Sequence, residues 1–123
     1  MDSNYLGCFA EYLFASECTK RGFIVSMPLL DSSVYDCIID VNGLLLKIQI
    51  KSTEKSPEIN TPSVCVPFSN KKNKYSLNKI DWFCVYSKYF DGFFNFPNTG
   101  NMQSIRISKT GKNSIFFNNF TFL

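Results

Sequence analysis

The sequence predicts an α+β domain built around a mixed β-sheet, and three features lead to this fold class. Apolar residues recur at helical spacing over residues 4–20, which indicates an amphipathic helix. The dipeptide Asn42-Gly43 separates two apolar segments and is typical of a tight antiparallel hairpin. Several short apolar segments follow, with turn residues between them. Neither a repeat nor a clear boundary interrupts this order, so a single domain is expected over residues 1–123.

The predicted helix is marked at both ends. Asp2 or Ser3 can cap the first turn, because their side-chain oxygens accept hydrogen bonds from free backbone N–H groups. Lys20 suits the negative end of the helix dipole, and Gly22 is a natural stop because it tolerates the left-handed conformation.

The other elements are predicted to be strands. The hairpin joins a strand over residues 34–41 to one over residues 44–52, because Asn and Gly accept the positive φ that a two-residue turn requires. Further short strands are expected at residues 23–27, 64–68, 82–86, 92–96, 104–108 and 114–117.

Composition narrows the chemistry that the chain can perform. The absence of histidine excludes Ser-His and Cys-His nucleophiles and removes the usual general base. Catalysis must then rely on carboxylates, lysine or a metal ion. The five cysteines include no Cys-x-x-Cys pair, and we expect them to be reduced and buried rather than bound to zinc.

The chain carries no sign of a membrane or secretory segment. No apolar run reaches the roughly 20 residues that cross a bilayer, and the first residues lack the basic and apolar regions of a secretory signal. We therefore expect an intracellular protein that does not contact a membrane. The net charge of +3 is compatible with a polyanionic partner but does not identify one.

The hairpin places three polar side chains on one face. Counting back from the turn, Asp36 faces Gln49 and Val34 faces Lys51. Residues two apart on one strand point to the same side, so Asp36, Gln49 and Lys51 are expected to cluster with Cβ atoms roughly 5 to 8 Å apart. The opposite face is apolar and is expected to form the core. A β-bulge would shift this register.

Glu11 is the fourth polar residue of this group. Its helical neighbours, such as Gly7, Phe14 and Cys18, are small or apolar, so Glu11 lies on a stripe expected to pack against the fold. An unpaired carboxylate is costly there and favours a cation, either a metal ion or a lysine.

These motifs resemble the PD-(D/E)XK nuclease superfamily, and within it the intron-encoded homing endonucleases of cyanobacterial type. The resemblance covers roughly residues 5–52 and rests on Gly7-x-x-x-Glu11, Phe23 to Pro28, Tyr35-Asp36 and Gln49-Ile50-Lys51. It implies a restriction-endonuclease-like core, a mixed sheet flanked by helices. Tyr35 replaces the proline of the motif, and Gln49 replaces its acid, which removes one negative charge.

The resemblance also implies a site for Mg²⁺, with Mn²⁺ as a plausible substitute, because a hard cation prefers oxygen ligands. Asp36 is expected as the central ligand, with Glu11 bound directly or through water. Gln49 would offer its amide oxygen, and the Ile50 carbonyl is a further ligand by analogy with the family. Lys51 would orient the attacking water and stabilise charge on the phosphate.

Double-stranded DNA is the implied substrate, and several residues are candidates to contact it. Lysines of the basic connection and residues around a turn near the C-terminus could bind phosphate. These are Lys71, Lys72, Lys74, Arg106, Lys109, Lys112 and Asn113. A homodimer or homotetramer would supply active sites for both strands. The phenylalanines at 116, 117, 120 and 122 could form its interface or complete the core.

Two other functions stay open at this point. A Holliday-junction resolvase shares the arrangement of helix glutamate, aspartate and lysine motif. A DNA-binding module on a decayed nuclease fold is favoured by Gln49 and the small net charge. Asp36 and Lys51 taken alone would be read as a surface ion pair across a hairpin.

Overall fold

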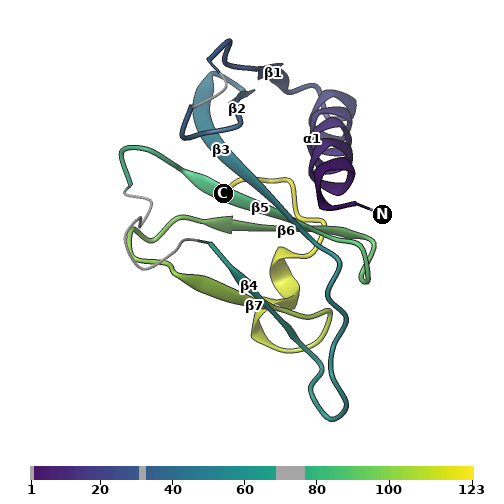
Figure 1. The fold of residues 1–123 in the computed structure, drawn as a ribbon. Helices are drawn as coiled ribbons and strands as arrows, with labels where there is room; N and C mark the ends of the chain where they lie inside the picture. The colour runs from purple at the N-terminus through teal and green to yellow at the C-terminus, as the bar shows by residue number, and fades with distance from the viewer. Residues whose placement is uncertain (1, 31–32, 69–76) are drawn as a thin grey trace.

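A computed structural model describes residues 2–30, 33–68 and 77–123 (Figure 1). The predicted DNA contacts at Lys71, Lys72 and Lys74 lie outside these residues. The elements in chain order are α1 (Ser3–Lys20), β1 (Ile24–Ser26), β2 (Cys37–Val41), β3 (Leu44–Thr53), β4 (Val64–Pro67), β5 (Trp82–Ser87), β6 (Gly92–Pro97), β7 (Ser104–Ile107) and the 3₁₀ helix η1 (Lys112–Phe116).

Helix α1 begins and ends as its sequence predicts. The Asp2 carboxylate accepts a hydrogen bond from the Asn4 N–H at 2.8 Å, which caps the first turn. Gly22 follows the last turn with φ of 83°, a conformation that glycine adopts without strain. The buried residues recur every four positions, at Leu6, Ala10, Phe14 and Cys18, and face the sheet.

The main sheet has five strands in the order β1-β2-β3-β5-β6. β3 and β5 run parallel, and each other neighbouring pair is antiparallel, so the sheet is mixed. β4 and β7 form a separate antiparallel pair, called here the β4–β7 ribbon. The predicted α+β fold class is confirmed.

The sheet separates two hydrophobic cores. Side chains alternate across β5, so Cys84 and Tyr86 join the core under α1, whereas Phe83 and Val85 join the core on the other side. Figure 1 shows α1 and the β4–β7 ribbon on opposite sides of the sheet. A helix therefore covers one face, and the ribbon with η1 covers the other. Within the described ranges, no helix is long and apolar enough to cross a membrane.

The predicted strand at residues 114–117 is wrong. This segment forms η1, and only Phe117 makes an isolated bridge, with Phe94. Local bonds decide the outcome, because the Ser114 hydroxyl and N–H both donate to the Gly111 carbonyl, at 2.7 and 3.3 Å. The first strand of the hairpin is also shorter than predicted, since β2 begins at Cys37.

The C-terminal phenylalanines complete the cores. Phe120 and Phe122 are each 5% exposed and pack under α1. Phe116 and Phe117 are half-buried against the opposite core. Of the two roles expected for these side chains, the structure places them in the core.

Candidate active site

The hairpin register agrees with the count from the turn. Cys37 faces Ile48 and Val41 faces Leu44, as a two-residue turn at Asn42-Gly43 requires. Both turn residues have positive φ, 54° and 95°. Cys37 and Ile48 point into the core under α1 and are fully buried. The hairpin of β2 and β3 therefore has the predicted register.

Asp36 departs from this ladder. It precedes β2, and its N–H donates to the Ile48 carbonyl at 2.8 Å, although Cys37 is the residue paired with Ile48. Two residues thus lie opposite one, which is the arrangement of a β-bulge. Bulges redirect side chains next to active sites. Asp36 consequently lies at the edge of the sheet instead of on the face predicted for it.

The Asp36 carboxylate binds the free edge of β3. Its Oδ2 accepts hydrogen bonds from the Ile50 N–H at 2.6 Å and from the Gln49 amide Nε2 at 2.9 Å. β2 no longer pairs with β3 at this point, so the carboxylate satisfies a backbone donor that the ladder leaves open. Asp36 and the Gln49-Ile50-Lys51 motif are held together by these bonds.

Glu11 reaches Asp36 from the other side of the sheet. Gln49 and Lys51 lie in register with Phe83 and Val85, which face away from α1. Glu11 lies on α1, yet it lines a pocket of about 220 Å³ together with Asp36. Asp36 lies at the edge of the sheet, so it shares this pocket with Glu11 while its carboxylate bonds to Gln49 and Ile50 and feels the charge of Lys51. The side chain that replaces the motif's proline, Tyr35, lines the same pocket.

The electrostatics of the site indicate an unneutralised negative charge. Burial raises the pKa of Glu11, and the neighbouring charge of Asp36 raises it further. Burial also raises the pKa of Asp36, and the Ile50 N–H bond and the Lys51 charge offset this only in part. Both shifts show that the folded chain resists holding two ionised carboxylates here. A divalent cation would relieve that repulsion.

The donor set fits a hard divalent cation. It consists of two carboxylates, the Gln49 amide and the backbone of Ile50. The N–H and C=O of one residue point to the same side of a strand, so the Ile50 carbonyl faces the same edge as the N–H that binds Asp36. Within the described residues, no three His, Cys, Asp or Glu side chains form a group that could hold a metal ion by themselves. Oxygen donors of which two are acids suit Mg²⁺, which retains several waters.

The predicted DNA contacts of the C-terminal region separate into two kinds. Arg106 and Lys112 are exposed. Lys109 places its Nζ 4.7 Å from the centre of the Phe117 ring, and the Asn113 Nδ2 donates to the Arg106 carbonyl at 2.7 Å. Lys109 and Asn113 thus have roles in the fold. Sequence reasoning missed Lys55, which lines a pocket with Arg106; its position four residues after Lys51 is the signal that could have found it.

This combination of a mixed sheet, a helix glutamate and an Asp/Gln-x-Lys site at a sheet edge defines a nuclease-type core. The family model of the PD-(D/E)XK endonuclease matches residues 1–114, and the chain belongs to this family. A solved structure of the bacterial homing endonuclease I-Ssp6803I is similar, with a TM-score of 0.74 and 25% sequence identity. The match covers 95% of this chain and 87% of that one. No curated protein matches the sequence.

Proposed function

We propose that this chain is a Mg²⁺-dependent, sequence-specific DNA endonuclease of the homing type, which makes double-strand breaks. The observation that carries the proposal is the position of Asp36, whose carboxylate binds the Gln49-Ile50 segment of β3 and shares a pocket with Glu11. The family supplies the reaction class, and the likeness to a homing endonuclease favours that role.

The proposed roles follow from the chemistry of each group. Asp36 and Glu11 hold the cation, with the Gln49 amide oxygen and the Ile50 carbonyl as neutral ligands. When bound, Mg²⁺ lowers the pKa of a water molecule and neutralises charge that develops on the phosphate. The Lys51 ammonium orients the attacking water and stabilises the phosphate oxygens. A bond from the water oxygen to phosphorus would form as one P–O bond of the diester breaks, with the proton of the water passing to solvent and the departing oxygen taking up a proton from solvent.

Lys51→Ala tests the catalytic assignment. Removal of the ammonium group should abolish cutting of the cognate duplex in Mg²⁺, a loss of at least about 100-fold, because transition-state charge loses its stabilisation. DNA binding should persist. Cleavage gels and gel-shift assays of the same preparations measure both, and Lys20→Ala, at the end of α1, removes the same charge away from the site.

The outcome also separates the rival functions. Cutting by Lys51→Ala at the wild-type rate would contradict the site. A wild-type protein that binds duplex DNA but does not cut it in Mg²⁺ or Mn²⁺ would favour the non-catalytic relic, the reading that Gln49 supports. Cleavage of four-way junctions in preference to linear duplex would favour the resolvase.

A homodimer or homotetramer is part of the proposal, since one chain carries one active site and a double-strand break needs two. The C-terminal phenylalanines are occupied in the core, whereas Tyr5, Phe9 and Tyr12 on α1 are 72%, 43% and 74% exposed. Glu11 is the one charged residue between Ser3 and Ser16. This face therefore suits a contact with a second copy of the same chain.

A further inference from the structure

The β4–β7 ribbon presents an exposed face that the active site does not use. Val64 and Ile107 pair across the ribbon and are buried in the core below it. Cys65 pairs with Arg106 on the opposite face, and both are exposed. The ribbon is thus one layer thick, with its outer face open.

Arg106 lies between two pockets on this face. The first, of about 460 Å³, is lined by Lys55 and by the hydroxyls of Ser56, Thr61 and Ser63. The second, of about 480 Å³, is lined by Arg106 and Lys112 and by apolar side chains such as that of Phe116. Arg106 thus shares one pocket with Lys55 and the other with Lys112, and these three cations are called here the basic row.

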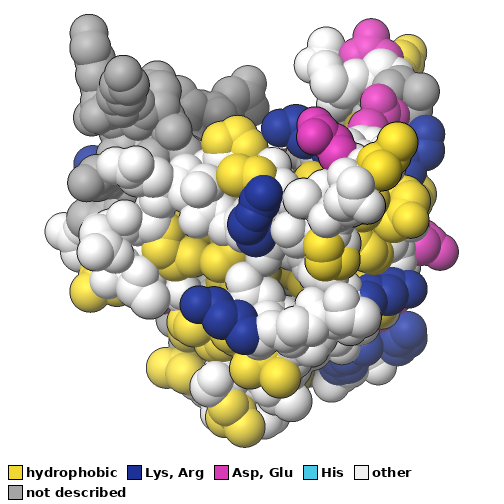
Figure 2. Space-filling view, turned by 90° about the horizontal axis from the view of Figure 1, so that it is seen from below, with side chains coloured by type: hydrophobic (Ala, Val, Ile, Leu, Met, Phe, Trp, Pro, Cys, Tyr) yellow, Lys and Arg dark blue, Asp and Glu magenta, His cyan; other side chains and the backbone are white. Residues whose placement is uncertain are grey.

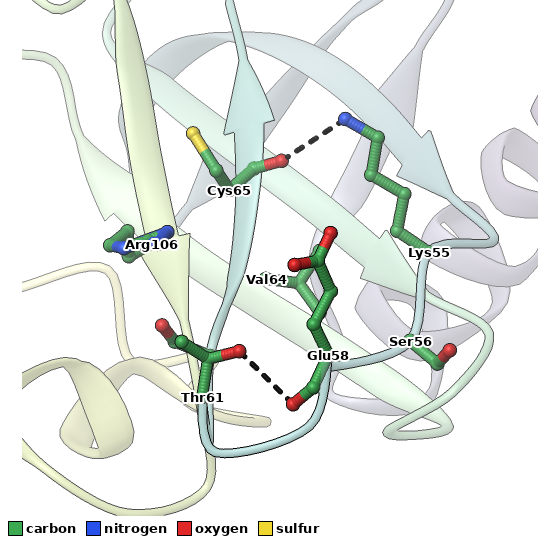
Figure 3. Close-up of a pocket in the computed structure, with 8 residues that line it drawn as sticks. Lys55, Ser56, Glu58, Thr61, Val64, Cys65 and Arg106 are labelled. Atoms are coloured by element: carbon green, nitrogen blue, oxygen red, sulfur yellow. Dashed lines mark hydrogen bonds between the residues drawn. The ribbon is translucent and has the colours of Figure 1, made fainter.

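The figures agree with this arrangement. Figure 2 shows Lys and Arg side chains spread across this side of the molecule, whereas the acidic side chains gather toward one edge. Figure 3 shows Lys55 and Arg106 on either side of β4, with Glu58 between them in the view.

The cations of the basic row are not used to hold the fold. Among the described residues, none of the three forms an ion pair. The Lys55 ammonium group donates a long hydrogen bond, 3.5 Å, to the Cys65 carbonyl. An arginine beside a pocket lined by serine and threonine offers donors for phosphate oxygens. These charges are therefore available to a polyanion.

We propose that the outer face of the β4–β7 ribbon docks on duplex DNA, with the basic row bound to phosphates and Cys65 beside the groove. The proposal rests on the proposed function and extends it to the mode of DNA binding. A two-stranded ribbon fits the major groove, and phosphate contacts fix its position there. Four residues of chain span at most about 14 Å, so Lys55 and Lys51 engage the same stretch of duplex.

Substitution of Glu58 tests the proposal because it should change the DNA affinity in the opposite direction to substitution of the cations. Its carboxylate lines the pocket between Lys55 and Arg106, where it repels a phosphate. Glu58→Gln should therefore strengthen binding of a labelled duplex of mixed sequence, whereas Lys55→Ala, Arg106→Ala and Lys112→Ala weaken it. Each of these three should lower the slope of log affinity against log salt by about 0.9 between about 50 and 200 mM salt. Lys20→Ala is the matched control and should leave the slope unchanged.

A second experiment locates the DNA directly. Cys8 and Cys65 are the two exposed cysteines of the five, and Cys18, Cys37 and Cys84 are buried. Saturating duplex should protect Cys65 from alkylation by a maleimide. Cys8, on the α1 face proposed to meet a second copy, should be labelled to the same extent with and without DNA. Mass spectrometry of the proteolytic peptides measures the extent of labelling at both cysteines. Equal labelling of Cys65 with and without DNA, or slopes equal to that of Lys20→Ala, would overturn the proposal.

Both measurements are made in EDTA, so they do not depend on cutting. Protection of Cys65 in a protein that never cuts would refute the endonuclease function and keep the docking face. Efficient cutting without protection of Cys65 would refute the docking face and keep the endonuclease function.

Discussion

At the scale of single residues, the molecule keeps two carboxylates close together where burial and mutual repulsion oppose their ionisation. Glu11 and Asp36 both have raised pKa values, and burial is the larger cause for each. Asp36 alone gains partial relief, from the Ile50 N–H and from Lys51. Such shifts cluster at functional sites, because the groups are placed for chemistry at a cost in stability.

These pKa shifts predict how the metal-free protein responds to pH. A raised pKa means that the folded chain binds the proton more tightly than the unfolded chain, so the associated stability is present at low pH and is lost as pH rises through the raised values. The loss should begin above about pH 4. Urea unfolding in EDTA should show it, and Glu11→Gln should flatten the decline and raise the midpoint at pH 7.

Mg²⁺ at pH 7 should reverse the decline in the wild type, because the cation replaces the protons at the site. It should have little effect on Glu11→Gln. The same pH dependence in this variant and the wild type would contradict the coupling of Glu11 with Asp36.

At the scale of elements, the unequal lengths of β2 and β3 create the site. β3 continues to Thr53, whereas its antiparallel partner begins at Cys37. The backbone of β3 beyond Ile48 is therefore open on that side, and the Asp36 carboxylate occupies it. The tight turn fixes which residue of β2 reaches this point, since a slip of one residue would invert every side chain.

Gly43→Ala should weaken the hairpin by about 1–3 kcal/mol in the free energy of unfolding. A Cβ at this position meets nothing within 4 Å, so the cost comes from φ of 95° alone. Gly7→Ala is the matched control, because its Cβ is also unobstructed but the helical backbone favours alanine by about 0.5–1 kcal/mol. Urea titration measures both. Equal effects of the two changes would contradict the role of the turn.

The exposed face of α1 carries the oligomer proposal. Tyr5→Lys with Tyr12→Lys should shift the protein to a smaller species in sedimentation, because like charges would then meet across the two-fold axis. Thr19→Lys, at an exposed position in the last turn of α1, is the control for added charge. An unchanged sedimentation coefficient in the Tyr variant would place the interface elsewhere.

At the scale of the whole molecule, the C-terminal tail closes the core under α1. The Phe122 ring contacts those of Phe14, Phe23, Trp82 and Phe120, with centroid distances from 5.2 to 6.4 Å. Helix, sheet and tail therefore meet at one aromatic cluster. The catalytic geometry depends on it, since α1 carries Glu11 and rests on this core.

Phe122→Ala should lower the free energy of unfolding by about 3–5 kcal/mol, a large part of the total for a chain of this size. Leu123→Ala is the adjacent control and should change it by less than about 0.5 kcal/mol, because Leu123 is fully exposed. Thermal and urea unfolding of both variants test this. A small effect at Phe122 would show that the tail packs loosely.

Local signals in the sequence predicted most of the helix and strands. The N-terminal cap, the Asn42-Gly43 turn and the alternation along β3 each depend on neighbours within a few residues, and each was correctly predicted. The strand at 114–117 was wrong, because a short apolar segment carries the same pattern in a strand and in a 3₁₀ turn. The hydrogen bond from the Ser114 hydroxyl to the Gly111 carbonyl favours the 3₁₀ turn over the strand.

By itself, the sequence determined which groups are available: two acids, an amide and a lysine, and no histidine. It also determined the hairpin register, since turn chemistry is local. Only the tertiary structure decided how Asp36 comes close both to Glu11, on α1, and to the Gln49-Ile50 segment of β3. The bulge at Asp36 and the early end of β2 open the sheet edge there. Those features arise from the packing of distant segments, which no short stretch of sequence encodes.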